Sequence, residues 1–202
     1  MIRKWIVLCW LILIFSGISL LFWHNEWKYS LPTPVPHNYQ PVNPGTPISI
    51  GNVFKQRDPS KPVLLHFFNP DCPCSRFNIT HFKSLVKQYG DKIDFVIIAM
   101  PGKDKNYTAL DIQDRFRLSL PVLFDSSIAA TCGVYSTPQA VLIGADHRLY
   151  YRGNYNKSRY CTDKKSNYAQ MAIDSLLLKS AGPSFGEAAV KSYGCELPLC
   201  TK

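Results

Sequence analysis

Glycine, acidic side chains and repeated segments are all scarce in this sequence of 202 residues. Only 11 glycines are present, which excludes a collagen-like chain, and 46% hydrophobic residues exclude a wholly disordered one. No segment of about 20–50 residues recurs, which argues against a solenoid. Asp and Glu total 14 against 23 Lys and Arg, so the net charge is +9. The length suits one globular domain of ordinary size with an appendage.

Charge is also absent from residues 5–23, which read WIVLCWLILIFSGISLLFW. An uncharged apolar run of this length can cross a bilayer core of about 30 Å. Arg3 and Lys4 precede the run, and a positive flank favours the cytoplasmic side. The alternative is a cleaved signal peptide, whose apolar core is shorter and ends at small residues, whereas this run continues into HNEWKYS. We therefore predict an uncleaved single-pass anchor of the inner (cell) membrane, with the rest of the chain periplasmic or otherwise extracytoplasmic.

Residues 24–47 are rich in proline, and they hold Pro32, Pro34, Pro36, Pro41, Pro44 and Pro47. Proline favours extended backbone and removes hydrogen-bond donors, so this segment is predicted to be a semi-rigid spacer. The expected organisation has three parts. These are a cytoplasmic flank and anchor over residues 1–23, a linker over residues 24–47, and a globular domain with a cysteine-containing tail over residues 48–202.

The periodicity of apolar residues alternates between strands and helices in the globular part. The expected strands are 62–68, 93–100, 138–144 and 148–153, the last two joined by a turn at 145–147. The expected helices are 75–89, 108–117 and 166–182, the last with Ser166 as N-cap and Gly182 as its stop. This order predicts an α/β domain with a mixed central sheet and helices on both faces.

The most informative local motif is Cys72-Pro73-Cys74, between the first expected strand and the helix that follows it. A thiol at a helix N-terminus is stabilised as the thiolate by unpaired backbone N–H groups and by the helix dipole. Two cysteines at this spacing can pair only through a tight bend. Loop entropy would contribute roughly 1.6 kcal/mol to such a bond, so a Cys72–Cys74 disulfide is expected to be reduced easily.

A second motif, Thr137-Pro138, precedes the third long strand. Proline cannot donate to a sheet ladder, so its position at the start of a strand is informative. A cis bond at this point would shape a loop whose backbone groups could pair with an extended peptide.

Together these features resemble the thioredoxin superfamily over residues 48–182. The resemblance is closest to a bacterial branch of membrane-anchored, redoxin-like proteins related to the peroxiredoxin (AhpC/TSA) and thiol-reductase folds. It implies that Cys72 is the exposed nucleophile and that Thr137 and Pro138 form the cis-proline loop. It also implies that His66 stands where a buried carboxylate moves protons for the second cysteine. A packed core histidine is the other interpretation of His66.

The sequence departs from the family pattern at two positions. Ser75 stands where the second cysteine of Cys-x-x-Cys is expected, so either Cys74 or another cysteine, such as Cys132, would resolve a mixed disulfide. Asn69 stands where peroxiredoxins carry threonine or serine, which disfavours a peroxidase.

The remaining cysteines suggest a structural bridge in the tail. Cys9 lies in the apolar segment, where it is an apolar filler. An oxidising compartment would allow either Cys161–Cys195 or Cys195–Cys200 to form, and the sequence does not choose between them.

The leading hypothesis is a membrane-anchored thiol–disulfide oxidoreductase that acts on extracytoplasmic protein thiols or disulfides, without a cofactor and without nucleic acid. Its expected catalytic residues are Cys72, Cys74, Thr137, Pro138 and His66. One alternative is a copper(I) chaperone or assembly factor, because two soft thiolates with a histidine bind this ion. Its ligands would be Cys72, Cys74 and His147, with His81 also available. Another alternative is a non-catalytic interaction module.

Overall fold

The computed structural model describes residues 2–27, 30–51, 58–158, 160–179 and 185–198. The chain divides into two compact units, Met1–Leu31 and Pro32–Lys202, and each is described by itself.

The first unit is helical. Helix α1, Ile2–Phe22, has a mean hydropathy of 2.5, and it is long and apolar enough to cross a membrane. A short π-helix, η1 (Trp23–Trp27), follows it, and its two tryptophan rings stack with their centroids 5.9 Å apart. The apolar segment predicted over residues 5–23 is therefore helical along nearly its whole length.

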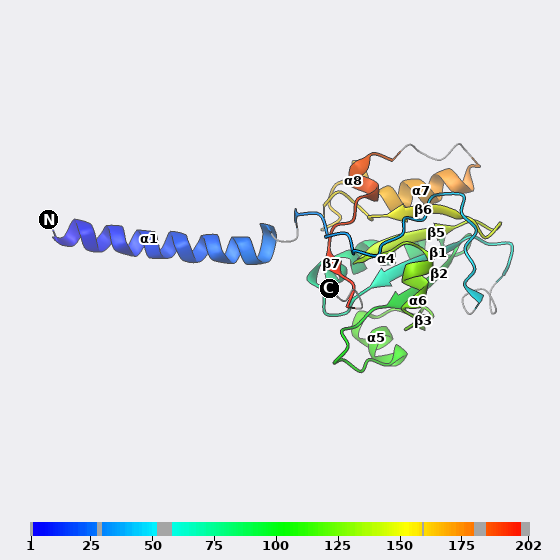
Figure 1. Ribbon diagram of the computed structural model, residues 1–202, viewed down its shortest axis with the longest axis horizontal. Helices are drawn as coiled ribbons and strands as arrows, with labels where there is room; N and C mark the ends of the chain where they lie inside the picture. Colours follow the sequence, from blue (N-terminus) through cyan, green and yellow to red (C-terminus); the bar gives the residue numbers. More distant parts are fainter. Residues whose placement is uncertain (1, 28–29, 52–57, 159, 180–184, 199–202) are drawn as a thin grey trace. The chain divides into compact units, whose positions relative to one another are not determined.

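The second unit is built on a five-stranded sheet in the order β3-β2-β1-β5-β6 (Figure 1). The strands are β1 Val63–Phe68, β2 Asp94–Ala99, β3 Val122–Leu123, β5 Gln139–Ile143 and β6 Leu149–Gly153. Strands β1, β2 and β3 run parallel, and β5 and β6 are antiparallel to their neighbours. The sheet is therefore mixed, as the sequence predicts.

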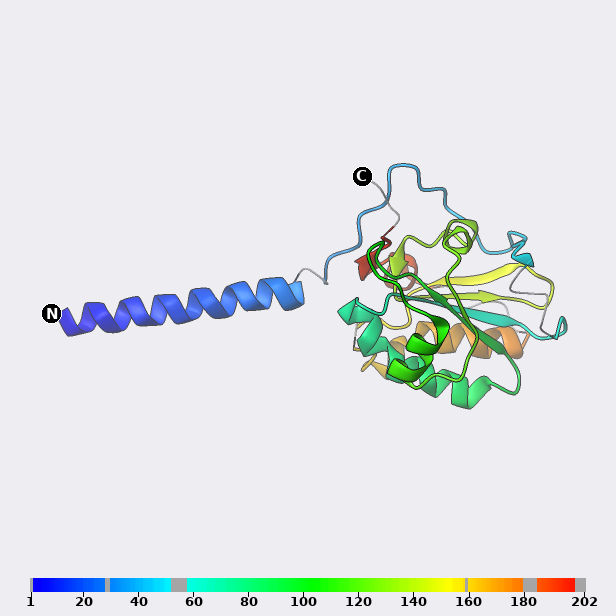
Figure 2. The ribbon, with the colours of Figure 1, turned by 90° about the horizontal axis from the view of Figure 1, so that it is seen from below.

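Both faces of the sheet are buried. On β1, Leu64 and Phe68 belong to one apolar cluster, while Leu65 and Phe67 belong to the other, because successive side chains point to opposite faces. Helices α4 (Pro73–Tyr89), α5 (Ala109–Phe116) and α7 (Tyr168–Leu177) contribute to the first cluster. Helix α6 (Ser127–Thr131) and residues 42–50 cover the second face (Figure 2). The predicted fold class is confirmed.

Helix ends follow local capping chemistry. Helix α5 begins at a capping box, in which the Thr108 hydroxyl accepts from Asp111 N and the Asp111 carboxylate accepts from Thr108 N. Helix α7 begins after Asn167 and not at Ser166, because Lys164–Ser166 forms a separate 3₁₀ turn, η2, capped by Asp163. The predicted stop at Gly182 lies outside the described residues.

Several short elements have no counterpart in the predicted list. They are β3, α6, a two-residue strand pair β4 (Ser136–Thr137) and β7 (Cys195–Glu196), and α8 (Glu187–Val190). Elements of two to five residues do not complete enough periods to be recognised from hydrophobic spacing.

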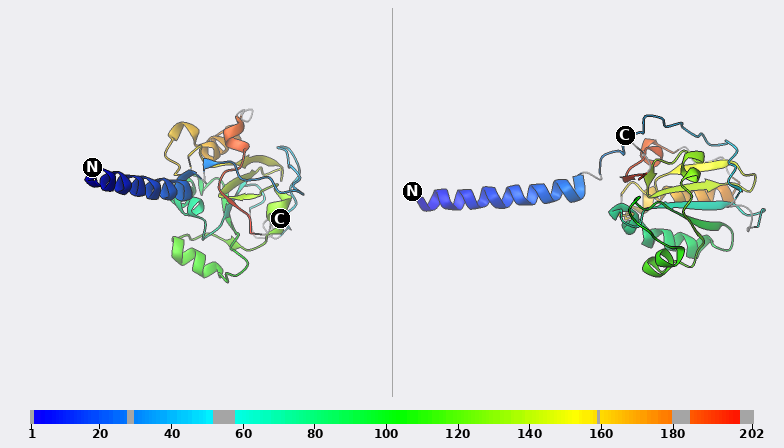
Figure 3. Two further views of the ribbon diagram at one scale, coloured as in Figure 1. Left: turned by 60° about the vertical axis from the view of Figure 1, so that its left-hand side comes forward. Right: turned by 60° about the horizontal axis from the view of Figure 1, so that its bottom comes forward.

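The proline-rich segment differs from the predicted spacer from Pro32 onward. Gly45 N donates to Leu149 O at 2.7 Å, and Ile48 N donates to His147 O at 2.8 Å. Arg152 Nη1 donates to Tyr39 Oη at 2.6 Å. Residues 39–48 of this segment (Figure 3) therefore pack along β6 and the turn before it, because the residues between the prolines keep N–H groups that can pair with the sheet edge.

Gly153 is predicted to be a position where a single methyl group destabilises the domain. A Cβ atom there would collide with Ala189 O and the Tyr151 hydroxyl. Gly153→Ala should lower the free energy of unfolding by roughly 1–3 kcal/mol, measured by urea denaturation. Gly102→Ala is the matched control, since a Cβ atom at Gly102 meets nothing within 4 Å. Equal stability of the two variants would contradict this account.

Candidate functional site

Cys72 lies between the end of β1 and the start of α4. It is the N-cap residue of that helix, has φ −77° and ψ 124°, and is followed by Pro73 in the first turn. The loop before it is closed by Cys72 N, which donates to Asn69 O at 3.1 Å, and by Asp71 N, which donates to Asn69 Oδ1 at 2.9 Å. The sulfur therefore faces the N-terminus of a 17-residue helix, where the helix dipole stabilises negative charge.

Two neighbours of Cys72 complete the loop. Ser75 is fully buried, and its hydroxyl accepts a hydrogen bond from Asn69 N at 3.2 Å. The residue in the usual second-cysteine position therefore holds the loop. Asp71, next to Cys72, accepts from Tyr107 Oη at 2.8 Å and lies 3.9 Å from Arg115 Nη1. These two partners bind the Asp71 carboxylate beside the loop.

The loop of Thr137 and Pro138 lies against Cys72. The Thr137–Pro138 peptide bond is cis, and the Thr137 carbonyl oxygen lies 3.8 Å from Cys72 Sγ. Strand β4 ends at Thr137 and pairs antiparallel with β7, so that Thr137 lies opposite Cys195. Cys72, the cis-proline loop and the carboxyl-terminal tail therefore meet at one place.

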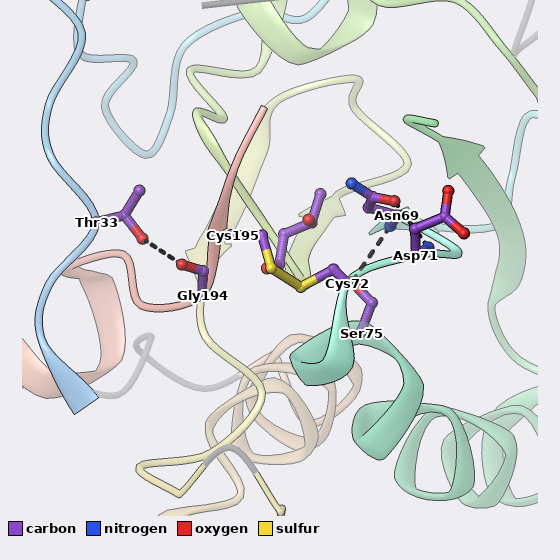
Figure 4. The surroundings of a disulfide bond; sticks show 8 residues. Thr33, Asn69, Asp71, Cys72, Ser75, Gly194 and Cys195 are labelled. Carbon is purple, nitrogen blue, oxygen red and sulfur yellow. Dashed lines mark hydrogen bonds between the residues drawn. A yellow bond between two sulfur atoms is a disulfide. The ribbon is translucent and has the colours of Figure 1, made fainter. Parts of the chain in front are cut away.

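Cys72 and Cys195 form a disulfide (Figure 4), with Cα atoms 6.2 Å apart and 123 positions apart in sequence. This pairing corrects the expected partners of both cysteines, which were Cys74 for Cys72 and Cys161 or Cys200 for Cys195. Strand β7 carries Cys195 to the Thr137 carbonyl that Cys72 already contacts. Cys74 is buried in the first turn of α4, where side chains two residues apart do not face each other. Cys200 lies outside the described residues.

The other thiols lie in surroundings that oppose ionisation. Cys132 is fully buried in the apolar cluster beneath α6, and burial raises its pKa to about 12. Burial likewise raises the pKa of Cys161 to about 11, although Asn78 Nδ2 donates to its sulfur at 3.1 Å. The possibility that Cys132 approaches Cys72 receives no support from this packing.

His66 is packed in the core. It is fully buried, stacks on Phe82 with ring centroids 4.1 Å apart, and its Nδ1 shares a 2.7 Å hydrogen bond with Tyr155 Oη. Burial lowers the pKa of His66 to about 3, so the ring is neutral at physiological pH. This favours the interpretation of His66 as a core histidine over that of a proton mover.

The residues of the copper alternative do not come together. His147 follows β5 at the end opposite Pro138, and the five residues of that strand span roughly 15 Å. His81 lies nine positions after Cys72 along α4, which corresponds to about 13 Å. Among the residues that the structure describes, no group of three or more His, Cys, Asp or Glu side chains could hold a metal ion.

Cys195 was expected only as a structural cysteine, and Ser75 only as a departure from the pattern. The sequence around Cys195 contains no local signal for its partner, because the pairing joins residues 123 positions apart. The one usable signal is the pattern Cys195-Glu196-Leu197, in which a polar residue stands between two apolar ones, as is typical of a short extended segment.

Solved structures share this architecture. A hypothetical protein from Sinorhizobium meliloti 1021 superposes with a TM-score of 0.64 at 20% identity, covering 79% of this chain and 96% of that one. A conserved protein from Geobacillus kaustophilus gives a TM-score of 0.62 at 20% identity, covering 83% and 97%. No curated protein matches the sequence.

The strand order, the cysteine at the N-terminus of the helix after β1 and the cis-proline loop together define a thioredoxin-like fold. The chain belongs to the family described as Domain of unknown function (DUF6436), whose profile matches residues 49–197.

In the His66→Gln variant, the free energy of unfolding is predicted to fall less on acidification than it does in the wild type. Between about pH 3 and pH 6.5 the unfolded chain binds a proton at His66 that the folded chain does not bind, so stability falls as the pH drops through this window. The loss from this group is about 3 kcal/mol at pH 4 relative to pH 7.5. Urea unfolding at both pH values measures it for wild type, His66→Gln and the exposed control His37→Gln. Equal slopes in wild type and His66→Gln would contradict the prediction.

Proposed function

We propose that the protein is a membrane-anchored, redoxin-like thiol–disulfide oxidoreductase that acts on extracytoplasmic protein thiols or disulfides. The observation that carries the proposal is the Cys72–Cys195 disulfide, which lies between the N-terminus of α4 and the cis Thr137–Pro138 loop. A helix N-terminus makes a cysteine a good nucleophile and a good leaving group in disulfide exchange.

The exchange proceeds in two steps. The Cys72 thiolate attacks one sulfur of an external disulfide, so that a bond to Cys72 forms, the external S–S bond breaks and one external thiolate leaves. The Cys195 thiolate then attacks the Cys72 sulfur, forming the Cys72–Cys195 bond and releasing the second external thiolate. Both released thiolates take up protons from water, and two electrons pass from the cysteine pair to the external disulfide. The reverse sequence oxidises an external dithiol.

The other predicted site residues receive defined roles. Thr137 binds the backbone of the segment beside Cys72, as it pairs with Cys195 of β7, and Pro138 shapes the loop through its cis bond. Cys195 takes the resolving role expected for Cys74, and Cys74 remains the alternative partner in the test below. His66 supports the packing under α4, since its neutral ring stacks on Phe82.

The proposal predicts that Cys72 and Cys195 titrate together in graded glutathione buffers. Alkylation and mass spectrometry of the full-length chain in detergent should detect a single two-electron couple in the range of about −270 to −120 mV. Cys72→Ser should abolish exchange with a model protein disulfide. Cys195→Ser should accumulate mixed disulfides on Cys72, because the second attack is missing.

Cys161→Ala is the control variant for this experiment and should exchange like wild type. A pair that stays oxidised at potentials well below that range, with Cys72→Ser as active as wild type, would indicate a structural disulfide in a non-catalytic interaction module. Accumulation of a Cys72–Cys74 bond in Cys195→Ser, in place of mixed disulfides, would assign the resolving role to Cys74.

The anchoring part of the proposal is supported by α1. Its length, its mean hydropathy of 2.5 and the positive residues Arg3 and Lys4 at its start favour a single span with a cytoplasmic N-terminus. Under this topology the domain carrying Cys72 lies in an oxidising compartment, where disulfides persist.

We predict that the mature chain keeps residues 1–23 and stays with membranes after alkaline carbonate washing. Protease added to spheroplasts should digest the domain, since it is expected outside the cytoplasm. Intact mass spectrometry distinguishes an anchor from a cleaved signal peptide. A mature chain that starts beyond Trp23 and is released into the soluble fraction would exclude the anchor.

A further inference from the structure

The start of the carboxyl-terminal tail, residues 188–192, is bound to the rest of the domain by buried hydrogen bonds. Gln139 Nε2 donates to Ser192 Oγ, and both side chains are fully buried. Asn154 Nδ2 donates to Lys191 O at 2.6 Å and to Ala188 O at 2.9 Å. The tail therefore enters the site from a defined position.

From Ser192 onward, the tail is extended and lies between two other segments of the chain. On one side, Thr33 N donates to Ser192 O at 2.9 Å and Thr33 Oγ1 donates to Gly194 O at 3.2 Å (Figure 4). On the other side, β7 pairs with β4, and Leu197 N donates to Tyr135 O at 3.3 Å. The tail thus binds the edge beside the cis-proline loop as an added strand, through backbone groups that any extended segment possesses.

Side chains add sequence preference at two positions of this strand. Gly194 has a φ of 137°, and a Cβ atom there would collide with the Thr137 carbonyl. Leu197 is 7% exposed and belongs to the apolar cluster beneath α6. Glu196, between Cys195 and Leu197, is exposed. The bound strand is therefore selected for glycine before the cysteine and an apolar side chain two positions after it.

We infer that the tail occupies, within its own chain, the binding site for external substrates, and that these are extended segments of the form Gly-Cys-x-apolar. This inference rests on the proposed function. In the mixed disulfide the external cysteine takes the place of Cys195 beside Cys72, and β7 leaves the edge of β4. When Cys195 returns and forms its bond to Cys72, the external thiolate leaves and β7 covers the site again.

The test uses the reduced full-length Cys195→Ser chain in detergent and synthetic peptides with the sequence of residues 192–198, SYGCELP. Each peptide carries its cysteine as a mixed disulfide with nitrothiobenzoate, whose release is followed by absorbance. Mass spectrometry confirms the adduct on Cys72. Rates are divided by those of the same peptides with free glutathione, which removes differences in intrinsic reactivity.

Peptides with alanine in place of the glycine, or aspartate in place of the leucine, should react with Cys72 at least about tenfold more slowly than SYGCELP. A peptide with glutamine in place of the exposed glutamate should react within about twofold of SYGCELP. Equal rates for all four peptides, with normal reactivity of Cys72 toward glutathione disulfide, would overturn this inference and leave the proposed function standing. No reaction of Cys72 with any disulfide would overturn the proposed function itself.

A second measurement does not depend on Cys195→Ser. Gly194→Ala in the otherwise wild-type chain should shift the Cys72–Cys195 equilibrium at least about fivefold toward the dithiol in glutathione buffers, because the added methyl group pushes β7 from Thr137. Gly186→Ala is the control, since a Cβ atom at Gly186 meets nothing within 4 Å and should leave the equilibrium unchanged. An unchanged equilibrium in Gly194→Ala would contradict the inference that the bound strand requires glycine before its cysteine.

Discussion

The pairing of β7 with β4 is the interaction on which the architecture of the site depends. It places Cys195 opposite Thr137, and the carbonyl of Thr137 already contacts Cys72. Bringing together residues 123 positions apart costs loop entropy, which the buried contact of Ser192 with Gln139 and the burial of Leu197 help to offset. The disulfide then forms between two sulfurs that non-covalent contacts have positioned.

The same sheet explains why the cysteines differ in chemistry. Burial of both faces puts Cys132 in an apolar cluster and raises its pKa to about 12. Cys72 is also buried, but it lies beyond the end of β1 at the N-terminus of α4, where the helix dipole stabilises negative charge. Residues next to the motif adjust this environment: Ser75 holds the loop, and Tyr107 and Arg115 bind the carboxylate of Asp71.

Under the proposed function, the strand edge beside Cys72 binds two kinds of segment, the tail and an external substrate. The tail pairs with this edge through Tyr135 and Thr137, and Thr33 binds it from the other side, mostly by backbone hydrogen bonds. We infer that an external segment uses the same groups, in which case tail and substrate compete for one site. In this view the tail carries both the resolving cysteine and a copy of the sequence that the site prefers.

The sequence alone predicted the helices and strands that are long enough to show a regular spacing of apolar residues. Residues 62–68, 75–89, 93–100 and 138–153 were predicted close to their observed bounds, because burial on two sheet faces and one helix face leaves a regular apolar pattern. The cysteine before a helix and the proline before a strand could also be recognised. Only the tertiary structure decided that Cys195 is the partner of Cys72, that residues 39–48 pack along β6 and that His66 is a neutral core residue. Each depends on contacts between distant segments, whose energies no local spacing encodes.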